Sequence, residues 1–422
     1  MTLAYRRDLL KLGMIATAGL LFSSFDQAAF AEETGSALTL PGGKGPCSGL
    51  PWFSGGFKNP DLFAGWRGRP LDVYTSFVAF DTWAAMLAFP GNTTFPAYSR
   101  KPVWLSLAYP LLPKTWGDTP FLSMWDECAE FDPARQTPAA SLFWARHLQI
   151  LDNIAAALQG PRTLCLGLVL RVGWEFDDPS SYWKLTNYGK AAQYRAVFQR
   201  LAEEARSRMP RVVIEWNPLR KGNEGAYFGD VWPGDGYVDI VSICHYDRMP
   251  SFDTQAIWDS YASRRNVKTK LVYNPKRRRN DILTLYDNPW GIETWAAFAR
   301  DHGKKFAVPE WALTNGWTST DNCKDRDNPL FIELMMKFFN DHADILAYES
   351  YFNSSTKHML YPPGEVAYAP ALETNSSNAP CRTPSLNWPT VDGGRLTSVN
   401  DRAAQRYKDL IQYYYEQANP VA

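Results

Sequence analysis

The stretch LGLVLRVGWEF, residues 166–176, is an apolar run that leads into Arg171, Trp174 and Glu175. An apolar run without polar alternation indicates a strand that is buried on both faces, as in a parallel sheet. Because side chains alternate along a strand, Arg171, Gly173 and Glu175 would share one face. A charged pair on a buried face is costly unless the charges are paired or used in chemistry. The stretch therefore predicts a parallel sheet and a candidate site at the end of one strand.

Apolar runs of strand length recur along the chain, and amphipathic segments that predict helices lie between several of them. The expected strands are residues 72–78, 103–108, 163–175, 212–217, 238–246, 270–274, 306–311 and 345–352. The expected helices include residues 189–209 and 329–342. This alternation, without a glycine-rich phosphate loop, favours an α/β fold of the (β/α)8 TIM-barrel type over a doubly wound sheet. We expect one barrel domain over residues 32–422, with an N-terminal extension at 32–70, a long C-terminal loop at 353–396 and a last helix at about 399–417.

The first 31 residues are typical of an export signal. Paired arginines, Arg6 and Arg7, precede an apolar stretch over residues 12–22, and Ala29-Phe30-Ala31 is a small-x-small cleavage pattern. The apolar stretch is shorter than the about 20 residues that span a bilayer. We predict a twin-arginine-type signal peptide and an exported protein, periplasmic or extracellular, without a stable membrane span after signal removal. An uncleaved anchor is the alternative.

The composition narrows the class of partner. The chain carries 44 basic and 44 acidic side chains, and zero net charge argues against nucleic acid, which needs a basic face. Aromatic residues make up 14% of the chain, with 17 tryptophans among them. Flat rings with a polar edge suit the faces of sugars, although additional core and rim packing explains them as well. The sequence does not indicate an oligomeric state.

The six cysteines fit an exported chain. Cys165 and Cys244 lie in expected buried strands and are predicted to be inert thiols. The other four lie in loop-like segments where disulfides are plausible, in any of three pairings: Cys47, Cys128, Cys323 and Cys381. The sequence has no CxxC pattern and no His pair at ligand spacing, so we expect neither a structural zinc site nor a cofactor.

A second strand end repeats the first pattern. FAVPEWAL, residues 306–313, is an apolar run that ends in Glu310, which is followed by Trp311. In a barrel the active site lies at the carboxyl ends of the strands, so Glu175 and Glu310 would face the same site. Two such carboxyl groups are what a glycosidase needs, one as acid and one as nucleophile or base. A purely structural ion pair between Glu175 and Arg171 is the alternative.

These motifs, with EWNP at residues 215–218 and PGDGYVDIVSICHYD at residues 233–247, resemble glycoside hydrolase family 26, a β-mannanase-related family in the clan of retaining (β/α)8 glycosidases. The resemblance covers roughly residues 60–352 and implies that the acid/base ends strand four and the nucleophile ends strand seven. It assigns these roles to Glu175 and Glu310. The remaining implied site residues are Tyr246, bonded to the nucleophile, Arg171, which orients a carboxylate, and Trp183 and Trp311, in contact with sugar.

The sequence also departs from the family pattern. Mannan-cleaving members carry His before the acid/base, where this chain has Trp174, and Asp177-Asp178 replaces an Asn-Gly that often follows. Trp174 would contact substrate or raise the pKa of Glu175 by excluding water. The aromatic residue expected at the end of strand eight is Tyr348, Tyr351 or Phe352, and Tyr351 is included among the predicted substrate contacts. These departures place mannanase activity in doubt but leave both glutamates.

Several weaker candidates remain open. Asn217 is predicted to reach the site from strand five, and His245 is predicted to bind sugar hydroxyls or to brace a loop, as are Asp239 and Asp247. The basic run at residues 276–279 is a solvated loop or a contact for acidic polysaccharide. We therefore expect a secreted retaining glycoside hydrolase that acts on a polysaccharide or oligosaccharide. The alternatives are a non-catalytic glycan-binding barrel and a transglycosylase of exopolysaccharide maturation.

Overall fold

The structure of the chain is a computed structural model. The structure describes residues 45–420 except for 58–59, 92–94, 116–127, 129–136, 179, 186–189, 220–227, 248–251, 275, 277, 314–327, 354–390, 393–394 and 397–400. All described residues belong to one compact unit, residues 37–422. The predicted signal peptide lies outside the described residues and stays a prediction. Among the described residues, no helix is both long and apolar enough to cross a membrane.

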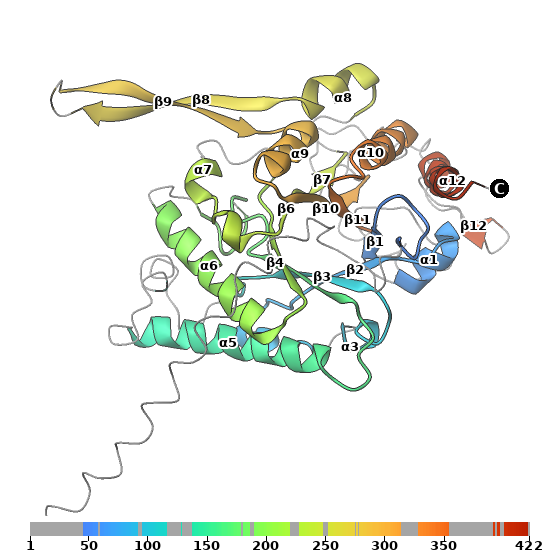
Figure 1. The fold of residues 1–422 in the computed structure, drawn as a ribbon, viewed down its shortest axis with the longest axis horizontal. Coiled ribbons are helices and arrows are strands. Elements are labelled where there is room, and N and C mark those ends of the chain that lie inside the picture. The colour runs from blue at the N-terminus through green and yellow to red at the C-terminus, as the bar shows by residue number, and fades with distance from the viewer. Residues whose placement is uncertain are drawn as a thin grey trace, which may run out of the picture. The chain divides into compact units, whose positions relative to one another are not determined.

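Eight parallel strand positions close into a barrel, which confirms the predicted fold class (Figure 1). In sheet order the strands are β1 (Ser54–Phe57), β2 (Val73–Phe77), β3 (Trp104–Tyr109), β4 (Gly167–Val172), β5 (Val212–Trp216), β6 (Ile240–Ser242), β10 (Lys305–Ala312) and β11 (Leu346–Tyr351). A short strand, β7 (His245–Tyr246), follows β6 and pairs with the carboxyl half of β10. Pairing of β11 with both β10 and β1 closes the barrel.

Helices lie around the barrel sheet (Figure 1). They are α1 (Pro60–Arg67), α2 (Trp83–Ala88), α3 (Phe95–Tyr98), α5 (Pro138–Leu158), α6 (Ala191–Arg208), α7 (Phe228–Val231), α8 (Gln255–Ala262), α9 (Ile292–Asp301), α10 (Pro329–Asp341) and α12 (Asp401–Ala418), with a short 3-10 helix at Asp235–Tyr237. The three helices expected near residues 189–209, 329–342 and 399–417 are α6, α10 and α12, within two residues at each end. Local signals set the start of α10, because Asn328 caps its first turn and Pro329 follows at the first helical position.

The strands alternate between an inner and an outer face. On the inner face, Thr75 donates to Ser350 at 2.7 Å, and the hydroxyl groups of Ser106 and Tyr348 lie 2.8 Å apart. Apolar side chains from several strands fill the remaining interior: Phe53, Val73, Trp104, Val169, Ile240, Ala307 and Ala347. The outer face packs against the helices in a larger apolar cluster. These four polar side chains on the inner face are therefore paired between strands.

Two expectations about the strands were wrong. Residues 270–274 are not a barrel strand but part of β8 (Arg265–Asn274), which pairs antiparallel with β9 (Arg279–Pro289) in a hairpin next to α8 and α9 (Figure 1). The eighth barrel strand is β1, inside the segment expected to be an N-terminal extension. Its sequence, SGGF, is too short and glycine-rich to give a strand pattern, but the fold needs a glycine there. A Cβ at Gly55 would lie 2.8 Å from the carbonyl oxygen of Val73.

The expected C-terminal loop and the disulfides are only partly covered by the described residues. Residues 354–390 lie outside them, and the end of the loop region forms a two-stranded pair, β12 (Val391–Asp392) and β13 (Arg395–Leu396). Cys47, Cys128, Cys165 and Cys244 form no disulfide within the described part of the chain, and Cys165 and Cys244 were expected to be thiols. Cys323 and Cys381 lie outside the described residues, so a disulfide that involves them stays a prediction.

Candidate active site

The carboxyl ends of β4, β5, β7 and β10 bring the predicted charged residues together. Arg171 on β4 donates from Nη2 to Oε1 of Glu310 on β10 at 2.7 Å. The Arg171 side chain has no exposed surface, and Glu310 is 6% exposed. This ion pair joins strands that are separated by 139 positions in the sequence, and it fixes the direction of the Glu310 carboxyl group.

Both oxygens of Glu310 accept hydrogen bonds. The hydroxyl of Tyr246, on β7, donates to Oε2 at 2.7 Å. Two donors, one of them cationic, stabilise the negative charge of a carboxylate. Burial opposes the charge of Arg171, but the carboxyl groups of Glu310 and Glu215 outweigh burial, so the pKa of Arg171 is raised. The site therefore holds a permanent cation next to Glu310.

Glu175 lies on the loop that follows β4, with a strained backbone. Its φ of 49° is in the left-handed region that non-glycine residues rarely adopt. The backbone N–H of Glu175 donates to the carbonyl oxygen of Asn217 at 2.6 Å, which ties the loop to the end of β5. Two residues earlier, Gly173 has a φ of 58°, and a Cβ there would lie 2.8 Å from Cδ1 of Leu111. Strain of this kind concentrates at functional sites, where surrounding contacts hold it in place.

The two glutamates differ in their electrostatic surroundings. Burial raises the pKa of Glu175 to about 8, and the negative charges of Glu310 and Asp178 add to that rise. A hydrogen bond with Cys244 and the charge of Arg171 act in the opposite direction but are weaker. Glu175 is therefore protonated at neutral pH, and it lies close enough to Glu310 for the two groups to interact.

The structure also contains a buried carboxyl group in this region that the sequence analysis missed. Glu215, on β5, has no exposed surface, and its Oε1 lies 3.3 Å from Nε of Arg171. Hydroxyl groups of Ser242 and Tyr348 donate to its two oxygens, each at 2.5 Å. The signal was present in EWNP, because strand alternation places Glu215 and Asn217 on the same inner face.

Asn217 is at the site but is occupied by protein contacts. It has no exposed surface, and its Oδ1 accepts from Nη2 of Arg171 at 2.8 Å. Its Nδ2 donates to the carbonyl oxygen of Ser242 at 3.2 Å. Asn217 therefore orients the arginine, and the expected contact with substrate is not what this geometry supports.

The tryptophans predicted to contact sugar are all buried. Trp174 is 7% exposed and packs against Trp183, whose indole N–H donates to the carbonyl oxygen of Trp174 at 2.9 Å. Trp174 directly precedes Glu175 in the chain, and the role of the two rings in excluding water from Glu175 stays a prediction. Trp311 has no exposed surface, because its indole points to the outer face of the barrel and donates to Glu349 at 2.5 Å. The expectation that Trp311 contacts sugar is therefore wrong for this structure.

Other predicted contacts are also buried away from the site. His245 packs among the rings of Phe252, Trp258 and Phe331, and its expected sugar contact gives way to loop bracing. Tyr351 has no exposed surface and accepts from the backbone N–H of Leu313 at 3.3 Å, so it too is a structural residue. Bracing also explains the two aspartates of this region. Asp239 pairs with Arg206 at 3.0 Å, and Asp247 accepts from Phe252 N–H and Asn328 at 2.8 and 2.9 Å.

Four half-buried aromatic residues form a rim near the two glutamates. Phe352, directly after β11, stacks on Phe57 with ring centroids 4.5 Å apart and planes within 1°. Phe77 and Tyr246 meet the same Phe352 ring edge to face, at 6.0 and 6.2 Å. Of the three aromatic residues considered for the end of the eighth strand, Phe352 keeps exposed surface, whereas Tyr348 and Tyr351 have none.

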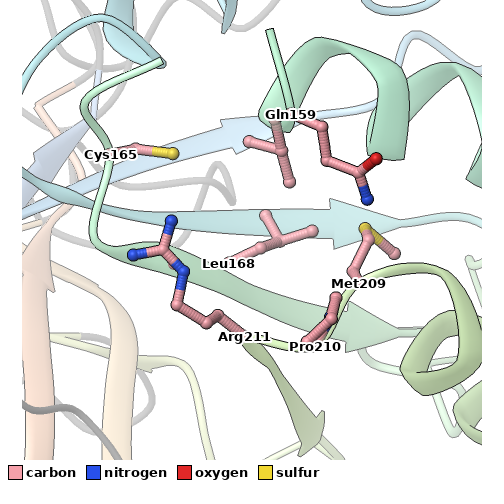
Figure 2. Close-up of a pocket in the computed structure, with 8 residues that line it drawn as sticks. Gln159, Cys165, Leu168, Met209, Pro210 and Arg211 are labelled. Atoms are coloured by element: carbon pink, nitrogen blue, oxygen red, sulfur yellow. The ribbon is translucent and has the colours of Figure 1, made fainter. Parts of the chain in front are cut away.

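A pocket at the other end of the barrel is separate from this site. It holds about 130 Å³ and is lined by Leu158, Gln159, Cys165, Gly167, Leu168, Met209, Pro210 and Arg211 (Figure 2). These residues lie near the amino ends of β4 and β5, whereas the active site of a barrel of this kind lies at the carboxyl ends of the strands.

Of the basic run expected at residues 276–279, Lys276 and Arg278 are exposed between β8 and β9. Among the described residues, no group of three His, Cys, Asp or Glu side chains could hold a metal ion.

Comparison with known proteins supports the fold. No family model matches the sequence, and no curated protein matches it. The catalytic domain of the GH26 endo-β-1,4-mannanase of Bacillus sp. JAMB-750 aligns at TM-score 0.52 and 14% identity, over 87% of each chain. A modular endo-β-1,4-mannanase of Cellulomonas fimi aligns at 0.50 and 16%, over 77% of this chain and 70% of that one. GH26C of Muricauda sp. MAR_2010_75 aligns at 0.50 and 12%, over 78% and 86%. At these identities the likeness is one of fold, and it agrees with the family resemblance found in the sequence.

Proposed function

We propose that the protein is an exported retaining glycoside hydrolase that cleaves β-glycosidic bonds of a polysaccharide. Glu175 is the acid/base and Glu310 the nucleophile. One observation carries the proposal: two interacting carboxyl groups at the carboxyl end of the barrel have opposite surroundings. Burial raises the pKa of Glu175 to about 8, whereas Arg171 and Tyr246 donate to both oxygens of Glu310. Such a division separates the proton donor from the anionic nucleophile in glycosidases.

The reaction proceeds in two displacements. First, a carboxylate oxygen of Glu310 attacks the anomeric carbon while Glu175 gives its proton to the leaving glycosidic oxygen. The bond between that oxygen and the anomeric carbon breaks, and a covalent glycosyl ester forms. Next, Glu175 accepts a proton from water, the water oxygen attacks the anomeric carbon, and Glu310 leaves as a carboxylate. The two inversions together retain the configuration at the anomeric carbon.

The rim of Phe57, Phe77, Tyr246 and Phe352 supports a sugar substrate, because aromatic faces pack against the apolar faces of pyranose rings. β-Mannan is the first substrate to test, since two of the solved structures with this fold are endo-β-1,4-mannanases. Trp174 occupies the position at which mannan-cleaving relatives carry His, so the test also needs other glycans.

The test is a screen of the purified mature protein against β-mannans, β-glucans, xylans and bacterial exopolysaccharides, with new reducing ends and product lengths as readouts. We expect cleavage of at least one glycan, and ¹H NMR of the first product should show the β anomer. Glu310→Gln is the control, and it should release no product. Binding without cleavage would favour a glycan-binding barrel, products longer than the substrate would indicate a transglycosylase, and an α-anomeric first product would contradict the covalent mechanism.

A further inference from the structure

Glu215 is buried beneath Arg171 in a fixed set of hydrogen-bond donors. Its carboxyl group accepts from Ser242 and Tyr348, each at 2.5 Å, and lies 3.3 Å from Nε of Arg171. The Tyr348 hydroxyl gives its proton to Glu215, so the hydroxyl of Ser106, 2.8 Å away, donates to Tyr348 in turn. Burial raises the pKa of Glu215, and the charge of Arg171 and the hydrogen bonds from Ser242 and Tyr348 counteract that rise.

Arg171 is shared between two carboxyl groups. Nη2 contacts Glu310 at 2.7 Å, and Nε faces Glu215 at 3.3 Å. The remaining groups that face this cluster are neutral at neutral pH. Burial raises the pKa of the Cys244 thiol and of the Tyr246 hydroxyl well above their ordinary values, and Glu175 is protonated. Glu310 and Glu215 are therefore the two carboxyl groups that form ion pairs with Arg171 in the described part of the chain.

The proposed reaction changes this balance. When Glu310 forms the glycosyl ester, its negative charge disappears while Arg171 stays charged and fully buried. A buried cation that loses its partner is strongly destabilised. Glu215 does not take part in the chemistry, so its contacts with Ser242, Tyr348 and Arg171 are the same in the free enzyme and in the covalent intermediate.

We propose that Glu215 is the permanent counter-ion of Arg171, a positioning residue that keeps the guanidinium group compensated while Glu310 becomes a neutral ester. The inference rests on the proposed function for its kinetic part. Its electrostatic part, the charge of Glu215 and its coupling to the site, can be measured without any substrate.

The electrostatic part is tested by carboxyl ¹³C NMR of protein labelled at glutamate Cδ. The resonance that is missing from Glu215→Asp identifies Glu215, which should be ionised at pH 7 in the wild-type protein. In Glu215→Gln, loss of one negative charge should lower the pKa of Glu175, now about 8, by about one unit. Glu349→Gln removes a buried carboxyl from the outer face of the barrel and is the matched control, with no shift of Glu175. A protonated Glu215 at pH 7 would overturn the proposal without any variant, as would an unshifted Glu175 in Glu215→Gln.

The kinetic part uses a dinitrophenyl glycoside of the sugar that the glycan screen identifies. In Glu215→Gln, kcat/KM, which reports ester formation, should fall about ten- to hundredfold, because Arg171 is left without a negatively charged partner in the ester. Hydrolysis of the ester restores the Glu310 carboxylate next to Arg171, so the rate of that step in a burst experiment should be unchanged or higher. Equal losses in both steps would mean a merely structural role and overturn the proposal. If the wild-type protein cleaves no glycan, the proposed function fails, while the NMR titration still decides the charge of Glu215 and its coupling to Glu175.

Discussion

Glu310 and Glu349 lie on neighbouring strands, β10 and β11, and both carboxyl groups are buried, but they belong to opposite faces of the barrel wall. Glu310 faces the inside, where it pairs with Arg171, contacts Tyr246 and interacts with Glu175. Glu349 has no exposed surface, and the donors that contact it in the described part of the chain are neutral groups. These donors are the Trp311 indole at 2.5 Å, the Trp52 indole at 3.5 Å and the hydroxyl of Ser54.

The difference shows what distinguishes a reactive carboxyl group from a structural one. Burial raises the pKa of Glu349, and nearby donors, together with the more distant charge of Arg67, counteract that rise. Its neighbours are large indole rings from the core, so no substrate atom could approach it. Glu310 keeps 6% of its surface exposed and is held by one cation and one hydroxyl at an open strand end. Burial of a carboxyl group alone therefore does not mark a catalytic residue.

The largest expected effect separates these two glutamates by activity. Glu310→Gln removes the nucleophile without changing the shape of the side chain and should lower kcat/KM roughly 10⁴- to 10⁶-fold. Glu349→Gln should leave kcat/KM within about threefold, because Glu349 has no contact with the site. Steady-state kinetics on the same glycan checks both variants. Comparable losses in the two would erase the distinction between the inner and outer carboxyl groups.

The second effect concerns the acid. Glu175→Gln cannot donate a proton and should lower kcat about 10²- to 10⁴-fold. In the wild-type protein the pKa of Glu175 is raised to about 8, so the acid is protonated below that value and activity should fall as the pH rises through about 8. A pH–rate profile should show this alkaline limb in the wild-type protein and lack it in the variant. A limb that persists in Glu175→Gln would assign it to another group.

The third effect concerns stability, for which Glu349 should matter more than Glu310. In Glu349→Gln, one carboxyl oxygen is replaced by an amide N–H₂ group. That group is a hydrogen-bond donor, and it would face donors that now contact the carboxyl oxygens. We expect the free energy of unfolding to fall by about 1–3 kcal/mol, the range for a buried hydrogen-bonding group that loses its partner. Urea unfolding measures this loss. Glu310→Gln, measured alongside, should lose less, since its partner Tyr246 can donate to the amide oxygen.

The smallest effect tests the backbone that carries Glu175. Gly173→Ala forces a Cβ into the left-handed region at a φ of 58° and within 2.8 Å of Leu111, and should cost about 1–2 kcal/mol of stability. Because the added Cβ displaces the loop that carries Glu175, kcat should fall as well. Gly65→Ala, on α1, is the control, since a Cβ there meets no atom within 4 Å. If Gly173→Ala changed neither the stability nor kcat, the backbone conformation at Gly173 would not be what positions the loop.

Much of the fold followed from patterns along the chain. Runs of apolar residues located seven of the eight barrel positions, and amphipathic spacing located α6, α10 and α12. The failures have a local cause. SGGF in β1 is too short for a pattern, and residues 270–274 have the composition of a buried strand although they pair antiparallel with β9 outside the barrel. Strand composition reports a preference for extended backbone, and it does not name the partner strand.

By itself, the sequence determined the chemistry that is present: carboxyl groups at the ends of two apolar strands, Arg171 before one of them, and a surplus of aromatic rings. Only the tertiary structure decided which of these groups meet. It buried Trp311 and Tyr351, left Phe352 half-buried, and added Glu215, a residue of the EWNP motif to which the sequence had assigned no role. The physical reason is that both faces of a barrel strand are buried and apolar, so a pattern of period two cannot say whether Glu310 or Glu349 points inward. Closure of the barrel and the register between strands settle that choice.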